Sequence, residues 1–563
     1  MSFASNGVAN PKVASQAEGA GEIASQSDDK MINVVRGNNV RAYVTVVVLF
    51  IINLLNYMDR QTVAGLLDGI QSYFDIQDNN SAAGLLQTVF ICSYMVLAPV
   101  FGYLGDRYRR KYLMAAGILV WSGTVFASTM LSKDSFWWFL VLRGVVGIGE
   151  ASYSTIAPTV IADLFTGDMR TRMLSFFYFA IPVGSGLGYI VGTEVAALFG
   201  HQWQWGLRVT PIIGAVCVFL CIFVVHEPKR GAIERGENPH GVSASDVHNT
   251  TSWWADLKYL TTVKSFIWLN LGFTCVSFVT GALAFWAPKF LLYATRAQGI
   301  SETESEVSLK VGIITCVAGI VGVWLGAEIA WRYRTRNRKA DALVCAVALI
   351  GSAPFLYGCL VLASTNIKVT YALIFFGEVL LFMNWAPVGD MVLYIIIPSR
   401  RSTAEAAQIL VSHLFGDAGS PWLVGEISDR IRGAGSSDKD RAQSMEYSLL
   451  MSTFISVIGG FCFIMCSIYL VDDREKAEQV TRNEDEDTNS LLNTVPSDDF
   501  LQAGHENGAV DNCSDYDDDN DDDELLDDEP ISPAMSEREA LVVPVDVHGT
   551  PPTAEEEHNF KVV

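Results

Sequence analysis

The sequence predicts an all-α membrane protein with twelve transmembrane helices in two six-helix halves. Half of the 563 residues are hydrophobic and only 18% are charged. The mean hydropathy is positive, at +0.27. The apolar residues form long runs without the polar stripe, repeating every ~3.6 residues, that marks a helix of a soluble protein. A soluble chain of this length would carry more charge, so that class is excluded.

Twelve apolar runs are long enough to be membrane spans. A bilayer core about 30 Å thick needs ~20 residues of helix to cross it. In chain order, the runs cover residues 42–66, 82–104, 112–131, 136–162, 172–199, 207–226, 266–293, 309–331, 341–363, 369–397, 402–425 and 447–470. An even number of spans places both termini on the same side of the membrane.

Basic residues predict that this side is the cytoplasm, where loops are enriched in lysine and arginine. The expected inner loops contain Arg107–Lys111, Arg170 with Arg172, Arg332–Lys339, and Arg400 with Arg401. The first expected outer loop, 67–81, has no basic residue. The last outer loop runs against the trend, with Arg430, Arg432, Lys439 and Arg441.

Three landmarks recur at nearly constant spacing and indicate a duplicated six-helix unit. The segment GYLGDRYRRK begins at Gly102, and GAEIAWRYRTRNRK begins 224 residues later, at Gly326. Gly-Glu pairs at 149–150 and 377–378 are 228 residues apart. The basic pairs Arg170/Arg172 and Arg400/Arg401 follow spans 4 and 10 and are about 230 residues apart. Parallel repeats of this kind are a recurring transporter architecture.

The expected organisation therefore has five parts. They are a disordered cytoplasmic N-terminal segment (1–41), a six-helix bundle (42–226), a cytoplasmic central loop (227–265), a second six-helix bundle (266–470) and an acidic disordered cytoplasmic tail (471–563). Residues 472–563 carry 29 acidic and 5 basic residues, a net charge of −24, whereas the whole chain has −23. The body is thus close to neutral, which excludes a basic nucleic-acid binder. Nine of the ten cysteines lie in apolar runs, as expected for free buried thiols rather than a disulfide framework.

Several motifs together resemble a known transporter family. The loop GYLGDRYRRK resembles the signature loop of the major facilitator superfamily. The segments NYMDR (56–60), SYMVLAPVFGYLGDR (93–107), RGVVGIGEASYSTIAPT (143–159), FYFAIPVGSGLGYI (177–190), IPSRRSTAE (397–405) and SHLFGDAGSP (412–421) resemble the spinster family of that superfamily. The resemblance covers about residues 42–470 and implies the major facilitator fold.

Two branches of that family are familiar: proton-coupled exporters of lysophospholipids in lysosomes, and exporters of sphingosine 1-phosphate in the plasma membrane. Met58, Val183, Ser402 and Glu405 resemble the lysosomal branch. The resemblance therefore favours proton-coupled export of lysophospholipid from the lysosome or late endosome by alternating access. A sphingolipid or sphingosine 1-phosphate exporter remains the alternative, and a polytopic sensor or receptor is the alternative of another class.

Four charged residues lie at membrane depth in the first half: Asp59, Arg60, Arg143 and Glu150. Charged side chains there need a partner or a water-filled cavity. A phosphate favours a bidentate guanidinium, so Arg60 and Arg143 are candidates for headgroup binding. Carboxyl groups in a low-dielectric cavity can exchange protons in the pH range of an acidic organelle, so Asp59 and Glu150 are candidates for proton coupling, Glu150 for substrate binding as well. The alternative is a structural ion pair between Asp59 and Arg143.

The second half adds weaker candidates. Glu378 and Asn384 lie in the tenth run and are candidates for substrate binding. His413 lies in the eleventh run, and histidine titrates near pH ~6.5, which makes it a candidate for proton coupling. For His413 and Glu378 the alternative is a packed, hydrogen-bonded residue.

A separate cluster is expected at the cytoplasmic edge. Asp106, Arg107 and Arg110 follow the second span, and Asp163 ends the fourth. The resemblance to the superfamily implies that they form a gate that locks helices together in the outward-facing state.

Other chemistry is not expected. GSGLG at 184–188 lies in an apolar helix rather than after a strand, so its glycines indicate close helix packing and not dinucleotide binding. There is no Walker loop and no HExxH motif, so no cofactor, metal site or enzyme activity is predicted. The expected partners are the lipid substrate, protons and membrane lipids, with no nucleic acid, and the protein is expected to be a monomer.

The tail and the first outer loop carry signals for modification and sorting. An acidic residue precedes two leucines at Asp487 with Leu491/Leu492 and at Asp521 with Leu525/Leu526. This pattern resembles the acidic dileucine signal read by sorting adaptors of endosomes and lysosomes. Asn79 begins a glycosylation motif in the first outer loop, whereas Asn249 lies in the central cytoplasmic loop and is expected to stay unmodified.

Overall fold

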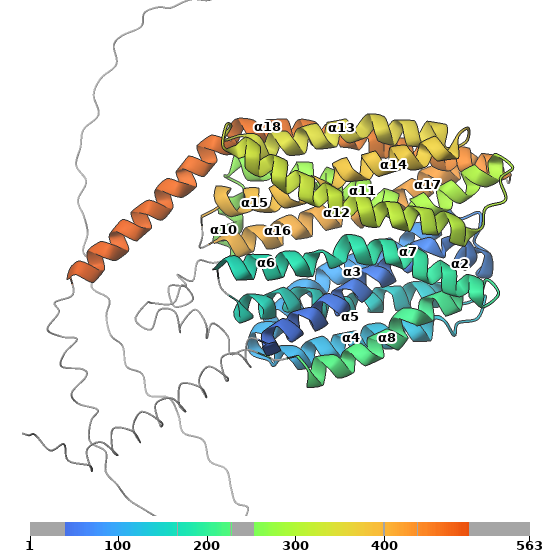
Figure 1. The fold of residues 1–563 in the computed structure, drawn as a ribbon, viewed down its shortest axis with the longest axis horizontal. Helices are drawn as coiled ribbons and strands as arrows, with labels where there is room; N and C mark the ends of the chain where they lie inside the picture. The colour runs from blue at the N-terminus through green and yellow to red at the C-terminus, as the bar shows by residue number, and fades with distance from the viewer. Residues whose placement is uncertain are drawn as a thin grey trace, which may run out of the picture. The chain divides into compact units, whose positions relative to one another are not determined.

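The computed structural model describes residues 40–165, 167–225, 227, 253–397, 400–435 and 437–494. The described residues are organised as a bundle of long helices (Figure 1). Among them, nine helices are long and apolar enough to cross a membrane. These are Val40–Gly65, Asn80–Gly105, Arg172–Leu198, Trp203–Phe223, Lys264–Ala297, Glu304–Arg334, Ala340–Leu362, Ile367–Ile395 and Asp438–Asn483.

The three other predicted runs are also helical. The run 112–131 is α4 (Arg110–Ser128), and 136–162 is α5 (Phe136–Leu164). The run 402–425 is divided into α16 (Arg401–Ser412), the π-helix η2 (His413–Asp417) and α17 (Ser420–Arg432).

The remaining helices are bounded as follows: α2 (Leu67–Tyr73), α3 (Asn80–Arg107), α6 (Gly167–Tyr178), α7 (Ala180–Leu198), α8 (Trp203–Phe223), α10 (Trp253–Leu260), α11 (Lys264–Ala297), α12 (Glu304–Arg334), α13 (Ala340–Leu362), α14 (Ile367–Phe382), α15 (Trp385–Ile395) and α18 (Asp438–Thr494). The helix Val40–Gly65 is called the first span below.

A proline lies shortly after a break in each of the three predicted spans that are divided, although Pro99, Pro158, Pro211, Pro288 and Pro354 lie inside continuous helices. The run 172–199 changes from α6 to α7 at Phe179, three residues before Pro182. The run 369–397 changes from α14 to α15 three or four residues before Pro387, and η2 is followed by Pro421. Proline lacks an N–H, so the carbonyl four residues earlier loses its helical partner. Hydropathy alone does not detect such breaks, so it predicts one helix for each of these runs.

The last helix extends beyond the predicted end of the twelfth run at residue 470. It continues to Thr494, so the beginning of the expected disordered tail is helical. Arg474 pairs with Glu478 one turn later, at 2.7 Å, and no proline interrupts the helix before Pro496. The rest of the tail lies outside the described residues.

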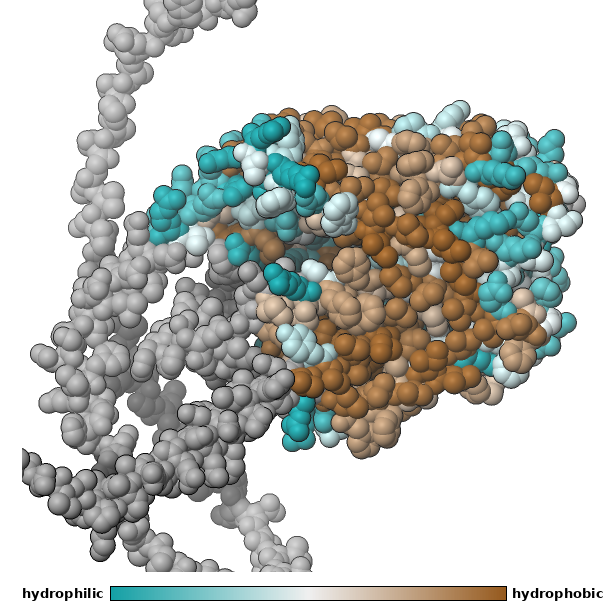
Figure 2. Space-filling model, in the orientation of Figure 1, coloured by the Kyte–Doolittle hydropathy of each residue, from teal (hydrophilic) through white to brown (hydrophobic). Residues whose placement is uncertain are grey.

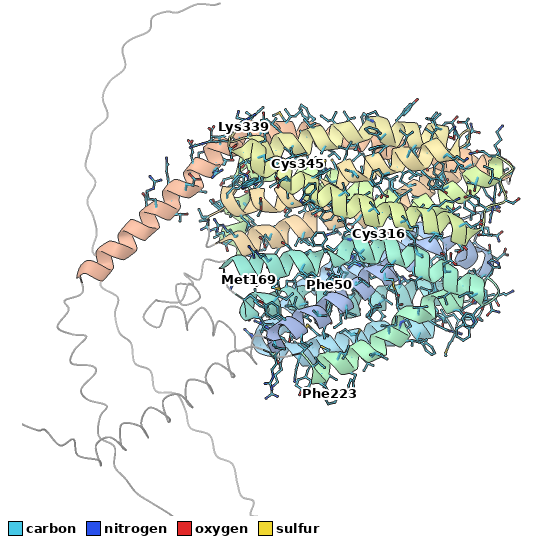
Figure 3. The ribbon with its side chains drawn as sticks, viewed as in Figure 1. Phe50, Met169, Phe223, Cys316, Lys339 and Cys345 are labelled. Atoms are coloured by element: carbon cyan, nitrogen blue, oxygen red, sulfur yellow. The ribbon has the colours of Figure 1, made fainter. Side chains whose placement is uncertain are left out.

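The helices from the first span to α8 and those from α11 to α18 form two groups that meet along two seams (Figure 1). At one seam α7 packs on α12; at the other α3 packs on α17. Cys316 of α12 lies at the first seam, where its thiol contacts the carbonyl oxygen of Val183 at 3.6 Å (Figure 3). A Cβ atom on Gly186 would lie 2.4 Å from the carbonyl oxygen of Gly312, so glycine permits this contact.

The glycines of GSGLG pack as predicted. A Cβ atom on Gly184 would lie 2.5 Å from the carbonyl oxygen of Leu54, and one on Gly188 would lie 2.4 Å from that of Met58. Both contacts are with the first span. The motif therefore brings α7 close to the helix that carries Asp59 and Arg60.

The outer surface supports a position within a membrane. Figure 2 shows a broad hydrophobic band across the helices, with hydrophilic residues at the end that carries α2 and at the opposite end, near α18. Exposed apolar residues of the long helices include Trp324, Val347 and Phe223, each at least 60% exposed. Such a continuous apolar surface would be unusual for a protein in water. We call the end that carries α2 the distal end, and the end that carries α10 the proximal end.

Candidate functional site

Two ion pairs join the first span to α5. Arg60 Nε donates to Glu150 Oε1, and Arg143 Nη1 donates to Asp59 Oδ2 at 3.4 Å. Thr210 of α8 also donates to Asp59, at 2.6 Å from Oδ1. Asp59, Arg143 and Glu150 are buried, with at most 2% of their surface exposed. The structure thus brings together all four candidates of the first half, and Asp59 and Arg143 form the pair that the structural alternative requires.

The two arginines differ in their surroundings. The Arg60 guanidinium lies over the rings of Tyr57, Phe90 and Tyr94, at 4.8, 5.1 and 5.0 Å from the ring centroids. Its side chain is 10% exposed, whereas that of Arg143 is 3% exposed. The Arg143 guanidinium also lies over the ring of Phe90, at 5.0 Å from its centroid. Aromatic faces stabilise a desolvated guanidinium, so Arg60 is held beside Glu150 without full burial.

The two pairs leave polar atoms unused. Among the described residues, Glu150 Oε2 and the Nε and Nη2 atoms of Arg143 have no hydrogen-bond partner. Buried polar atoms are usually satisfied. The site can therefore accept further polar groups, such as a ligand, water or a rearranged side chain, without first breaking both ion pairs.

The second-half candidates make separate contacts. Thr315 of α12 donates to Glu378 Oε1 at 3.1 Å, and Glu378 Oε2 has no partner among the described residues. Asn384 is fully buried at the junction of α14 and α15, where its Nδ2 donates to the carbonyl oxygen of Leu381 at 3.0 Å. His413 Nδ1 lies 2.9 Å from both carboxylate oxygens of Asp417, within η2. Each of these three residues has its partner in its own half of the chain.

The predicted gate is assembled in part. Arg110 Nη1 pairs with Asp163 Oδ2, and the Arg110 backbone N–H donates to Glu227 Oε1 at 2.6 Å. Arg107 instead has its guanidinium 4.0 Å from the ring centroid of Tyr103. The side chain of Asp106 lies outside the described residues. The described part of the gate thus joins α4 to α5 within the first half.

A cluster that the sequence analysis missed joins the two halves at the distal end. Lys289 of α11 is 2% exposed and donates to Gln71 Oε1 and, at 2.9 Å, to Asn80 Oδ1. Asn80 Nδ2 donates to Ser428 Oγ at 3.4 Å, and the backbone N–H of Ser81 donates to Asp429 at 2.8 Å. We call Lys289 and these partners, with the ion pairs of Asp68 and Asp78, the distal cluster.

The ion pairs of the distal cluster explain the anomalous outer loop. Asp78 pairs with Arg432 at 3.6 Å and with Arg441 at 3.0 Å. Asp68 accepts from Tyr293 at 3.0 Å and pairs with Arg296 at 3.3 Å. Two of the four basic residues that departed from the positive-inside trend, Arg432 and Arg441, are therefore partners of an acidic residue in the first outer loop. Arg430 instead pairs with Glu426 of its own helix. That departure was the signal in the sequence that could have pointed to this contact.

Only some of the candidate residues for modification and sorting lie within the described part of the chain. Asn79 is exposed, and its side chain accepts from the backbone N–H of Ala82 at 2.8 Å as the N-cap of α3. Asp487, Leu491 and Leu492 belong to the last turns of α18. Asp521, Leu525, Leu526 and Asn249 lie outside the described residues. Within the described part of the chain, no group of three or more metal-ligating side chains is arranged to hold a metal ion.

Comparison with known proteins points to one family. The Major Facilitator Superfamily profile matches residues 49–420. "Protein spinster homolog 1" of Xenopus tropicalis is 54% identical over 80% of this chain and 85% of the relative, and that of Homo sapiens is 53% identical over 78% and 83%. "Protein spinster" of Drosophila melanogaster is 44% identical over 77% of this chain and 78% of the relative.

Solved structures share the fold. A crystal structure described as a bacterial homolog to human lysosomal transporter, spinster, in an inward-facing and unoccupied conformation matches with a TM-score of 0.66 at 19% identity. It covers 77% of this chain and 98% of the matched chain. A D-xylose-proton symporter matches with a TM-score of 0.55 at 16% identity, over 75% of this chain and 97% of the other.

Proposed function

Because the chain belongs to the spinster proteins of the major facilitator superfamily, and is thus a multi-pass membrane transporter and not an enzyme, we propose that it exports lysophospholipid from the lysosome together with protons. The transport proceeds by alternating access. A sphingolipid or sphingosine 1-phosphate is the alternative substrate. The family relationship argues against the earlier alternative of a sensor or receptor.

The observation that carries the proposal is the pair formed by Arg60 and Glu150 among three aromatic rings. A lipid phosphate and the Glu150 carboxylate both favour the same guanidinium. If the phosphate binds Arg60, Glu150 loses its counter-ion and is favoured to take up a proton. Proton and substrate are thereby linked through one arginine, which is the requirement for coupled transport.

The other candidates have supporting roles. Asp59 is the second carrier of protons, and its pair with Arg143 adjusts the charge beside Arg60. In the second half, Glu378 and Asn384 each retain a buried oxygen without a partner among the described residues, which suits contact with a polar headgroup. His413, which shares a hydrogen bond with Asp417, is the third candidate for proton coupling.

Two gates accompany the cycle. We assign the distal end to the lysosomal lumen and both termini to the cytoplasm, following the basic residues of the proximal loops. The distal cluster, closed in this structure, is the lumenal gate, and the pair of Arg110 with Asp163, together with Asp106 and Arg107, belongs to the cytoplasmic gate. Alternating access requires the distal cluster to open while the cytoplasmic gate closes.

The decisive experiment is uptake by liposomes that contain the purified full-length protein. Labelled lysophosphatidylcholine and labelled sphingosine 1-phosphate are compared with and without an imposed pH gradient. Uptake of the lysophospholipid that rises with the gradient supports the proposal. Selective uptake of sphingosine 1-phosphate instead supports the alternative substrate.

Location and topology are tested in cells. Replacement of Leu491, Leu492, Leu525 and Leu526 by alanine should move the protein from lysosomes to the cell surface if adaptors read these signals. A quadruple variant that stays lysosomal rejects the dileucine assignment. A glycan on Asn79 and none on Asn249 fits the assigned topology, whereas a glycan on Asn249 would invert it.

A further inference from the structure

Asn56 is a buried polar residue without a hydrogen-bond partner among the described residues. It lies in the first span with 2% of its surface exposed. Neither Oδ1 nor Nδ2 of its amide has a hydrogen-bond partner among the described residues. Buried amides are normally paired, and an unpaired one is costly. Asn53, one turn earlier, shows the usual arrangement: its Nδ2 donates to the carbonyl oxygen of Phe177 at 3.1 Å.

The register of the first span against α5 places Asn56 opposite the stretch of α5 that lies between Arg143 and Glu150. Tyr153 donates to the carbonyl oxygen of Leu49, and Arg143 pairs with Asp59. The two contacts are ten residues apart on both antiparallel helices. At this register Asn56 lies opposite residue 146, three residues from Arg143 and four from Glu150. On its own helix it precedes Asp59 by three residues and Arg60 by four, and such positions share one face.

The unused atoms on either side of Asn56 complement its amide. Arg143 has two free donors, Nε and Nη2, and Glu150 has one free acceptor, Oε2, among the described residues. A carboxamide supplies an acceptor oxygen and two N–H donors. Its oxygen can therefore accept from Arg143 while its nitrogen donates to Glu150. This structure contains neither bond, so they belong to a different state of the site.

We infer that Asn56 is a positioning residue that joins the two ion pairs when Asp59 takes up a proton. The inference rests on the proposed function, in which Asp59 carries protons. A proton transferred from water to Asp59 releases Arg143, whose guanidinium then turns to the Asn56 oxygen. The Asn56 nitrogen at the same time holds Glu150, and the amide itself neither gains nor loses a proton.

The consequence of this bridge is communication between the proton and the substrate. When Asp59 takes up a proton, the bridge changes the hydrogen bonding of Glu150, the carboxylate that competes with phosphate for Arg60. The charged and titratable groups around the amide come from the first span, α3 and α5, and are Tyr57, Asp59, Arg60, Tyr94, Arg143 and Glu150. Tyrosine and arginine side chains do not change charge between about pH 4 and pH 8, so a titration of this site in that range reports a carboxyl group.

The test compares Asn56→Leu with Asn53→Leu in the purified full-length protein. Tryptophan fluorescence is titrated between about pH 4 and pH 8, and the melting temperature is measured at each end. Asn56→Leu should shift the titration midpoint by about one unit to lower pH, a tenfold loss of proton affinity, because a bridge formed in the protonated state is missing. Its melting temperature should not fall at about pH 8, since no bond of this structure is lost, but it should fall at about pH 4, where the wild type forms the bridge. Asn53→Leu loses a buried bond, so its melting temperature should fall while its midpoint stays at that of the wild type.

An unchanged midpoint in Asn56→Leu overturns the inference, as does a wild-type protein that shows no titration in this range. A lower melting temperature with an unchanged midpoint would identify Asn56 as a structural residue only. The titration uses no lipid. A wild-type protein that titrates but does not transport lysophosphatidylcholine would therefore contradict the proposed substrate and leave the result for Asn56 standing.

Discussion

At the scale of single residues, the two arginine–carboxylate pairs are chemically alike but differ in access. The Arg60 pair retains partial exposure and a surround of three aromatic rings, whereas Arg143 and Asp59 are enclosed by α5, α8 and the first span. A ligand can therefore compete for Arg60 more readily than for Arg143. We expect Arg60 to contact substrate and Arg143 to act through Asp59.

Substitution of Arg60 tests this difference. Arg60→Ala leaves Glu150 buried without its partner, and breaking a buried pair costs about 3–5 kcal/mol. Uptake of lysophosphatidylcholine should be lost. Arg60→Lys should restore part of the uptake with a raised KM, because a point charge cannot reproduce the bidentate fork. Full activity of Arg60→Ala would remove Arg60 from the substrate site.

Neutral replacements of the carboxylates test proton coupling. Asp59→Asn and Glu150→Gln keep size and shape but cannot exchange a proton. In liposomes, each variant should transport with little or no stimulation by a pH gradient, and the double variant should have none. A folded double variant with a wild-type response to pH would move the coupling role to His413 or Glu378. A variant that loses stability before it loses pH response would instead support a purely structural pair.

At the scale of helices, backbone irregularities coincide with the candidate residues. Asn384 lies at the junction of α14 and α15, and His413 begins the π-helix η2. Breaks and π-helical turns occur where a helix must bend or present a side chain. Close contacts between glycines then allow the irregular helices to pack, most clearly where Gly186 of α7 meets Gly312 of α12.

Gly186→Ala tests the importance of that seam. The added methyl group would lie 2.4 Å from the Gly312 carbonyl oxygen, so α7 and α12 must separate. We expect destabilisation by about 1–3 kcal/mol, seen as a lower melting temperature, and reduced transport. Gly123→Ala in α4 is the matched control, because no atom lies within 4 Å of its Cβ position. Equal melting temperatures of the two variants would show that the seam tolerates separation.

At the scale of the whole molecule, the distal cluster holds the two halves together. Lys289, Asn80 and Asp429 form hydrogen bonds across the halves, and Asp78 binds two arginines of the second half. Each surface ion pair contributes little to stability. The buried ammonium of Lys289, however, cannot leave Gln71 and Asn80 unless other groups replace its two hydrogen bonds. Opening of this end therefore requires a concerted movement of both halves.

A disulfide across the cluster tests whether it opens during transport. Asn80→Cys with Ser428→Cys places two thiols at neighbouring positions of different halves. In the present structure Asn80 Nδ2 lies 3.4 Å from Ser428 Oγ. Oxidation should stop transport, and a reductant should restore it. Ser428→Cys with Ser444→Cys is the control, since these side chains are 3.2 Å apart within the second half and its cross-link should permit transport. Transport that continues with the first cross-link formed would show that the cluster is static.

The sequence by itself determined the membrane class, the positions of the spans and the residue types of the site. Hydropathy is a property of each run and does not depend on which helices become neighbours, so the first span and α11 were located closely. The family motifs added the fold. Three predicted runs are nevertheless divided shortly before Pro182, Pro387 and Pro421, and α18 continues beyond the predicted end. Backbone hydrogen bonding, and not hydropathy, sets those boundaries.

Only the tertiary structure decided the partners. Arg60 and Glu150 are 90 residues apart, and Asp59 and Arg143 are 84 apart, so the pairing depends on the register of two helices. The contact of Arg441 with Asp78 spans 363 residues. In sequence, the last outer loop was an exception to the charge rule; in the folded chain Arg432 and Arg441 of this loop pair with Asp78 of the first half. Long-range electrostatic contacts of this kind arise from helix packing, which no local pattern of residues specifies.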